Sequence, residues 1–247
     1  MTFSLLYLAK EPDQGVMDDL KQFEDHTITI CACLPGYVDY YKHLGYNVID
    51  YREVFNGTTM RFDVVIGNPP YGKNSNLAVQ FLNKVAELSD DIRMVLPRTF
   101  RKPSIINRLN PHLHLVSDVT CPDDTFPRGI KACYQRWEVR SDVREPIQTF
   151  KKEDTTDFTF LKSSEGSDCI ITRVANAGVV VRNTEPLVLT IPYHERSSST
   201  TYFLKVKDES VITKLESLQE QFIECSKETV GLNSLSIHDI VRLYLHG

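Results

Sequence analysis

Four consecutive residues in the first half of the chain combine hydrogen-bond acceptors, a rigid turn and an aromatic ring. Asn68-Pro69-Pro70-Tyr71 directly follows the apolar run FDVVIG, which is typical of a buried strand. The Asn68 side-chain oxygen and the Pro69 carbonyl can accept hydrogen bonds from an amine whose lone pair is delocalised into a ring. Proline fixes φ, so the Pro-Pro pair keeps both acceptors aimed, and Tyr71 offers a face for stacking. The tetrad therefore predicts a pocket for a planar amino compound, with a structural turn as the alternative.

The elements around the tetrad must position it. Strand-like and helix-like segments alternate through the first part of the chain, which predicts an α/β fold with a parallel, doubly wound sheet. In such sheets, ligands bind beyond the carboxyl ends of the strands, which is where the tetrad stands. We expect strands at 3–9, 27–33, 47–51, 61–72, 92–100, 113–120 and 131–140, the last two as an antiparallel edge pair, and helices at 16–23, 36–46, 76–90 and 102–110.

The character of the chain changes after Arg140. Residues 141–167 are polar, and we place a domain boundary between residues 145 and 146. Beyond it we expect a smaller α+β domain with two strands within 168–183, a third at 201–208 and a long helix at 209–227. Ser236 is positioned to cap a final short helix.

Composition narrows the class of protein. No run of 18 apolar residues is present, and the N-terminus lacks the basic lead-in of a signal peptide. The six cysteines form no CxxC pair and suggest reduced thiols in a cytoplasmic protein without a metal site. The net charge is −5, yet residues 93–140 carry 9 Lys/Arg against 4 Asp/Glu. This local excess is compatible with a phosphate-contacting face, with chance clustering as the alternative.

The tetrad and its flanks resemble a known family. FDVVIGNPPYG is similar to motif IV of amino-methyltransferases, in particular the N6-adenine DNA methyltransferases of phage and restriction-modification type. VLPRTF at 95–100 resembles the apolar-Leu-Pro-x-x-Phe element of that family, and IITRVANAGVV and SIHDIVRLY resemble segments of its small phage-type members. The resemblance is closest over about residues 60–140.

The resemblance implies a Rossmann-like class I methyltransferase sheet in residues 1–145 and a target-recognition domain in 146–247. It implies S-adenosylmethionine as cofactor and duplex DNA with a flipped adenine as substrate. Asn68 and Pro69 would polarise the amine, Pro70 would stiffen the turn, and Tyr71 would stack on the base. A homodimer or a partner subunit is left open.

The cofactor loop departs from the family pattern. The family binds its cofactor on a glycine-rich loop after the first strand, and neither AKEPDQG nor ACLPG contains a glycine pair. If residues 3–9 form the first strand, the acid expected after the second strand is replaced by cysteine; if 27–33 form it, Asp50 becomes that acid. Asp50 is the leading cofactor contact in either case, with a turn or helix cap as the alternative. Glu11 and Asp13 are further candidates.

Basic residues on predicted loops are candidates for holding nucleic-acid phosphates. Some of them follow the strand at 92–100, some lie on the turn before 131–140, and two flank the Asn176-Ala177-Gly178 turn, where a β-ribbon can enter a groove. The alternatives are a solvated basic loop and an ordinary hairpin. The candidates are Arg98, Arg101, Lys102, Arg128, Lys131, Arg173 and Arg182.

Two other functions remain open. The missing glycines fit a methyltransferase-like nucleic-acid-binding protein that does not bind the cofactor. Alternatively, the enzyme methylates RNA or a protein glutamine, because the same tetrad occurs in methyltransferases of those kinds.

Overall fold

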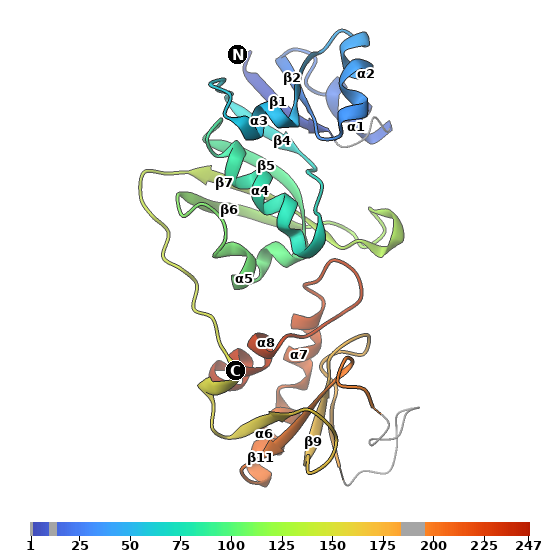
Figure 1. Ribbon diagram of the computed structural model, residues 1–247, viewed down its shortest axis with the longest axis vertical. Coiled ribbons are helices and arrows are strands. Elements are labelled where there is room, and N and C mark those ends of the chain that lie inside the picture. The colour runs from blue at the N-terminus through green and yellow to red at the C-terminus, as the bar shows by residue number, and fades with distance from the viewer. Residues whose placement is uncertain (1, 10–13, 184–195) are drawn as a thin grey trace. The chain divides into compact units, whose positions relative to one another are not determined.

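The computed structural model describes residues 2–9, 14–183 and 196–247 (Figure 1). The chain divides into two compact units, residues 1–147 and 148–247. Within the described residues, no helix is long and apolar enough to cross a membrane.

Unit 1 is built on a seven-stranded sheet with the order β3-β2-β1-β4-β5-β7-β6. The first five strands are parallel, and β7 runs antiparallel to both β5 and β6. The α/β, Rossmann-like sheet expected from the sequence is confirmed, as is the antiparallel edge pair. The strands are β1 (Ser4–Ala9), β2 (Thr27–Ala32), β3 (Asn47–Asp50), β4 (Val64–Gly67), β5 (Asp91–Pro97), β6 (Leu113–Thr120) and β7 (Ala132–Val139).

Helices cover both faces of this sheet near its centre. Successive side chains of a strand point to opposite faces, so Leu6 and Leu8 of β1 join one core while Leu5 and Tyr7 join another. Helices α3, α4 and α5 pack on the first core, and α1 and α2 pack on the second. The helices are α1 (Gln14–Lys21), α2 (Val38–His43), α3 (Tyr51–Asn56), α4 (Asn76–Val85) and α5 (Pro103–Ile106), with 3₁₀ turns at Pro35–Tyr37, Lys73–Ser75, Arg98–Arg101 and Pro127–Gly129.

The position of β1 decides between the two strand assignments left open by the sequence. β1 lies at the centre of the sheet, paired with β2 on one side and β4 on the other. Residues 3–9 are therefore the first strand, and β2 runs into Cys33 where the family pattern places an acid. Asp50 ends β3, the edge strand.

Unit 2 has a four-stranded antiparallel sheet with the order β10-β9-β11-β8 and three helices. Its apolar core contains Phe158, Leu204, Leu215, Phe222 and Ile240. The elements are the 3₁₀ turn Lys152–Asp154, β8 (Phe158–Leu161), β9 (Cys169–Thr172), β10 (Val180–Arg182), β11 (Thr201–Val206), α6 (Glu209–Ser217), α7 (Gln219–Ser226) and α8 (Ile237–His246).

Two expectations for this part of the chain are wrong and one is confirmed. Strand β8 lies within the polar stretch 141–167, where no strand was predicted, because Phe158 is buried in the unit 2 core and its strand pairs with β11. The helix predicted at 209–227 is two helices that meet at Leu218. Ser236 caps α8 as predicted, and its side chain accepts a hydrogen bond from the Asp239 N–H.

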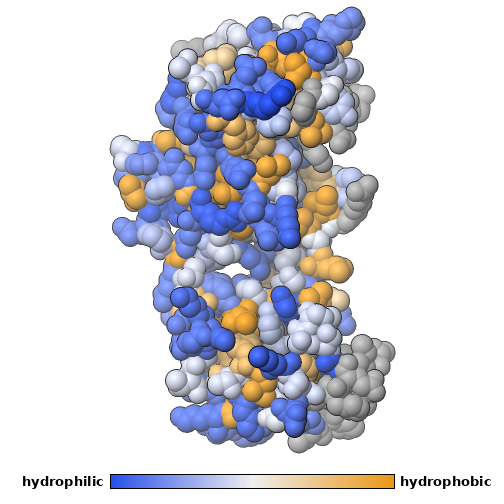
Figure 2. Space-filling model, in the orientation of Figure 1, coloured by the Kyte–Doolittle hydropathy of each residue, from blue (hydrophilic) through white to orange (hydrophobic). Residues whose placement is uncertain are grey.

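The described surface carries its apolar side chains in dispersed positions. On the face shown in Figure 2, hydrophobic residues are interspersed with hydrophilic ones. The most exposed large apolar residues are Leu232, at 74%, and Val119, at 60%, and they belong to different units.

Candidate active site

The tetrad lies at the carboxyl end of β4, beside the central strand β1. Gly67 and Leu8 are paired partners in these two parallel strands. A Cβ added at Gly67, whose φ is 142°, would lie 2.4 Å from the Leu8 carbonyl oxygen, so only glycine allows this approach. The Asn68 N–H then donates to the same carbonyl oxygen at 3.3 Å. The chain is thereby held against β1 just where Asn68 leaves the sheet.

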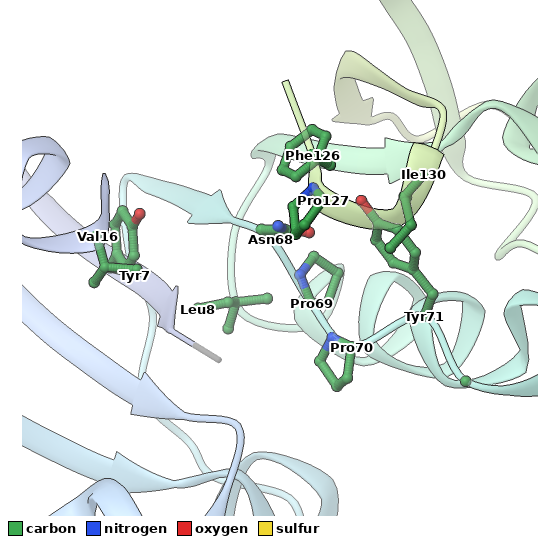
Figure 3. Close-up of a pocket in the computed structure, with 11 residues that line it drawn as sticks. Tyr7, Leu8, Val16, Asn68, Pro69, Pro70, Tyr71, Phe126, Pro127 and Ile130 are labelled. Carbon is green, nitrogen blue, oxygen red and sulfur yellow. The ribbon is translucent and has the colours of Figure 1, made fainter. Parts of the chain in front are cut away.

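A cavity of about 420 Å³ opens beyond this strand end. All four tetrad residues line it, as Figure 3 shows. The remaining wall comes from β1 and α1, from the glycine directly after the tetrad, and from the segment before β7. Those residues are Tyr7, Leu8, Val16, Gly72, Phe126, Pro127 and Ile130.

Tyr71 enters the cavity with a buried hydroxyl. Its ring packs against the core beneath α4, and its hydroxyl oxygen has no hydrogen-bond partner among the residues that the structure describes. Burial raises the pKa of the phenol well above its ordinary value of 10.0. Tyr71 is therefore a neutral ring with one unused hydrogen-bond donor.

The Tyr71 backbone is fixed as firmly as its ring. Its carbonyl oxygen accepts hydrogen bonds from the N–H groups of Leu77, at 3.1 Å, and Ala78, at 3.3 Å. These N–H groups belong to the first turn of α4, which has no side-chain cap. The start of a core helix thus anchors the last residue of the tetrad.

A second cavity of about 350 Å³ lies on the other side of Pro70, which lines both cavities. It stands beyond the carboxyl ends of β2 and β3 and is walled mainly by aromatic and aliphatic side chains. An apolar cleft of this size with few polar groups is typical of a small-molecule site. Its lining residues are Cys33, Leu34, Tyr51, Phe55, Pro70, Leu77, Gln80 and Phe81.

Asp50 adjoins the second cavity through its neighbour Tyr51, but its side chain caps α3. Its carboxylate accepts hydrogen bonds from the Arg52 N–H at 2.8 Å and from the Arg52 side chain at 2.6 and 2.9 Å. The side chain of Glu53 completes a capping box by accepting from the Asp50 N–H. The hydrogen bonds from Arg52 lower the pKa of Asp50 below its ordinary value. The helix-cap alternative is thus what the structure shows directly. Glu11 and Asp13 lie outside the described residues.

Arg98 and Arg101 have structural partners, which counts against the phosphate-binding role expected for them. The Arg98 side chain is only 8% exposed, forms an ion pair with Asp123, and donates to the Cys121 carbonyl at 2.9 Å. Arg101 donates to both carboxylate oxygens of Asp118, at 3.0 and 3.1 Å, and to Thr120. Their charges join the turn after β5 to the β6–β7 end of the same sheet.

The remaining basic candidates of unit 1 flank two turns. Lys102 stands at the N-terminus of α5 and is partly buried. Lys131 follows the cavity residue Ile130, and its carbonyl accepts from the Arg98 N–H at 3.2 Å. The side chain of Arg128 lies outside what the structure describes.

The two arginines of unit 2 differ sharply. Arg182 forms ion pairs with Glu209 and Glu216 and lowers the pKa of Glu216. Arg173 is exposed, lies 5.4 Å from the centre of the Tyr202 ring, and has no acidic partner among the described residues.

The turn between these arginines is not a free ribbon. A Cβ at Gly178 would lie 2.6 Å from the backbone of Ile223 in α7, so the turn packs tightly against that helix. This packing fits the ordinary-hairpin alternative, and entry of the turn into a DNA groove stays a prediction.

Sequence reasoning missed the wall opposite the tetrad. Phe126 and Pro127 lie in CPDDTFPRG, which reads as a polar turn, and the β6–β7 connection brings them to the cavity (Figure 3). The signal was a large aromatic residue within an otherwise polar turn. Nothing in the sequence indicated that Tyr7 and Val16 would line the same cavity. Among the described residues, no cluster of His, Cys, Asp or Glu could hold a metal ion.

One family model matches part of unit 1. The family model of the Eco57I restriction-modification methylase matches residues 17–94. This match confirms the predicted resemblance to adenine methyltransferases of restriction-modification type over those residues. No curated protein sequence matches the chain significantly.

Several solved structures are similar to part of this chain at low identity. TrmN from Thermus thermophilus is 14% identical with a TM-score of 0.43, over 56% of this chain and 44% of that one. The 23S rRNA methyltransferase ErmE is 15% identical with a TM-score of 0.39, over 57% and 63%. Coclaurine N-methyltransferase is 10% identical with a TM-score of 0.40, over 51% and 48%. This chain spans less than two thirds of each. Residues 17–94 thus match the Eco57I restriction-modification methylase family, and they belong to a unit built on a Rossmann-like α/β sheet.

Proposed function

We propose that this chain transfers a methyl group from S-adenosylmethionine to the N6 amine of adenine in DNA. The observation that carries the proposal is the cavity of about 420 Å³ whose wall holds the whole tetrad at the end of a central strand. Its volume falls within the range of roughly 300–1,000 Å³ of small-molecule sites. Asn68 and Pro69 provide acceptors there, and Tyr71 provides a neutral aromatic ring.

The protein's main contribution to this reaction is to position the amine and to accept hydrogen bonds from it. An exocyclic amine is a poor nucleophile because its lone pair is delocalised into the ring. Hydrogen bonds from its N–H groups to the Asn68 oxygen and the Pro69 carbonyl localise that lone pair on nitrogen. Held in this way, the nitrogen would be presented to the methyl group that S-adenosylmethionine would release from its sulfur, and one amine proton would leave to water. When bound, S-adenosylmethionine supplies a methyl group already activated by its sulfonium charge.

The second cavity fits the cofactor. Tyr51, Phe55 and Phe81 offer faces for a heteroaromatic ring, and Gln80 adds polar atoms. Pro70 lines both cavities, so a ligand in the second cavity would lie next to a base in the first. Asp50 remains our candidate for a ribose or adenine contact, alongside its role as a helix cap. Glu11 and Asp13 remain candidates beyond the described residues.

The target base would enter the first cavity as a flipped nucleotide. Flipping costs a few kcal/mol, which stacking and hydrogen bonds to the base edge offset. Tyr71 and Phe126 both line the cavity, so both are placed to contact the base (Figure 3).

DNA binding requires cations that the protein does not use internally. Arg98, Arg101 and Arg182 are poor candidates for contacts with DNA phosphates because each is ion-paired within its own unit. Arg173 is the best candidate for such a contact because it is exposed and has no acidic partner among the described residues. We assign unit 2 the target-recognition role on this basis. Lys102, Lys131 and Arg128 are the candidates near the cavity.

The biological setting follows from the substrate. A methylase of restriction-modification or phage type works in the cytoplasm of a bacterium or of an infected host.

Transfer of labelled methyl groups tests the proposal. Pure protein is incubated with labelled S-adenosylmethionine and either unmethylated DNA or RNA of matched composition, with and without host extract, and the products are digested to nucleosides. We expect label in N6-methyladenine from DNA. Label only in RNA or in protein contradicts the proposed substrate.

Calorimetry with S-adenosylmethionine distinguishes the proposed enzyme from a nucleic-acid-binding protein that does not bind the cofactor. We expect measurable binding by the protein alone. Binding of DNA without any cofactor binding or transfer supports a nucleic-acid-binding protein instead of an enzyme.

A further inference from the structure

The turn directly after the tetrad, residues 72–76, has an unusual backbone. Gly72, Asn74 and Ser75 have φ values of 67°, 53° and 59°. Among the described residues, only one other non-glycine residue, Ala175, has a positive φ. Two adjacent non-glycine residues in the left-handed region are strained, and such strain persists only where the surrounding structure holds it.

Contacts from the loop after β5 hold this turn. Ser75 is only 2% exposed, and its hydroxyl oxygen lies 2.9 Å from that of Thr99. Thr99 belongs to the 3₁₀ turn Arg98–Arg101. The Arg108 guanidinium adds a hydrogen bond to the Asn76 side chain. The loops that follow two neighbouring parallel strands are thus joined through a hydroxyl pair.

The held turn connects the tetrad to α4. Leu77 and Ala78 donate their N–H groups to the Tyr71 carbonyl across it. The approach is close, because a Cβ at Gly72 would lie 2.8 Å from the Leu77 Cβ. If the turn relaxed toward ordinary φ values, the hydrogen bonds between Tyr71 and α4 would change first. The ring of Tyr71 would then lose its fixed place in the cavity.

We propose that Ser75 and Thr99 are positioning residues for methyl transfer. Neither lines the cavity that holds the tetrad. Their hydroxyl pair keeps residues 72–76 in the strained form, which holds Tyr71 and the adjoining prolines where a base can be stacked. The catalytic consequence rests on the proposed function, whereas the structural consequence does not.

Hydrogen exchange tests the structural consequence without any substrate. Thr99→Val keeps the shape of the side chain and removes the hydroxyl, and Thr99→Ser keeps the hydroxyl. We expect the Leu77 and Ala78 amides to exchange about tenfold faster in Thr99→Val, equal to about 1.4 kcal/mol. We expect near wild-type exchange in Thr99→Ser. Unchanged exchange of these amides in Thr99→Val overturns the proposal.

Kinetics test the catalytic consequence. We expect kcat to fall about tenfold in Thr99→Val, with KM for cofactor and DNA within about twofold, and to recover in Thr99→Ser. Faster exchange with unchanged kcat contradicts a positioning role.

Ser89→Ala is the matched control. Ser89 is fully buried, and its hydroxyl bonds to backbone carbonyls at the opposite end of β5. We expect it to leave kcat unchanged. An equal loss of kcat in Ser89→Ala would assign the effect to general destabilisation and overturn the proposal. Absence of transfer by the wild-type protein refutes the proposed function, and it is recognised separately because the exchange experiment needs no turnover.

Discussion

The loops after β4 and β5 both begin with residues suited to a functional site, yet they use those residues differently. The loop after β4 turns Asn68 and Tyr71 toward a cavity. The loop after β5 uses Arg98 and Arg101 to form ion pairs with Asp123 and Asp118 of the same unit. Both loops follow a parallel strand of the same sheet. The difference is whether the polar groups are left free for a ligand, and only the first loop meets that condition.

Among the substitutions that test this difference between the two loops, we expect Asn68→Ala, in the loop after β4, to have the largest effect on kcat. Loss of one preorganised acceptor should lower kcat about 100- to 1,000-fold, by analogy with the loss of a single oxyanion-hole donor. Cofactor affinity by calorimetry should stay unchanged, because Asn68 does not line the second cavity. Asn56→Ala, on the exposed end of α3, is the control. Retained turnover in Asn68→Ala refutes the role assigned to that residue.

Arg98→Ala probes the loop after β5. The change removes hydrogen bonds to two backbone carbonyls and an ion pair. We expect the free energy of unfolding to fall by about 2 kcal/mol in urea titrations. The salt dependence of DNA binding should stay the same, because Arg98 contacts no phosphate. A shallower dependence on salt with unchanged stability would reverse our interpretation of this loop.

Tyr71→Phe tests the buried hydroxyl. Removing an unpartnered buried oxygen should change the free energy of unfolding by no more than about 1 kcal/mol, in the stabilising direction. Transfer should stay within a few-fold of wild type because the stacking ring remains. Since burial raises the pKa of this phenol above 10.0, the wild-type rate should show no titration of Tyr71 up to about pH 10. A large loss of kcat in Tyr71→Phe would instead assign the hydroxyl a direct hydrogen bond to substrate.

Arg173→Ala and Arg182→Ala compare an exposed arginine with an ion-paired one in unit 2. We expect these substitutions to have the smallest effects on DNA binding and stability. The exposed Arg173 should contribute about one phosphate contact, so its loss should lower the slope of log affinity against log salt by about 1. Loss of Arg182 should leave that slope unchanged and cost up to about 1 kcal/mol of unfolding free energy. Fluorescence anisotropy at several salt concentrations measures both variants. Equal slopes in the two variants would contradict the assignment of Arg173.

Local patterns predicted most of the fold. Continuous apolar runs such as FDVVIG indicated strands covered on both faces, and helical spacing indicated the segments between them. The failures have physical causes. Strand β8 was missed because its apolar residues stand in a polar surrounding and gain stability by pairing with β11. The long helix at 209–227 is divided at Leu218, a position where no glycine or proline marks the break.

The candidate site divides in the same way. The sequence alone determined the tetrad, because its chemistry depends on four adjacent residues and on the strand before them. Only the tertiary structure decided which distant residues complete the cavity, since Tyr7 and Phe126 meet the tetrad through strand pairing and the β6–β7 connection. It also decided that Arg98 is bound to Asp123 while Arg173 has no acidic partner in the part of the chain that the structure describes. Whether an arginine is available to bind a phosphate depends on which acidic residues the fold places beside it, and the order of residues in the sequence does not determine that by itself.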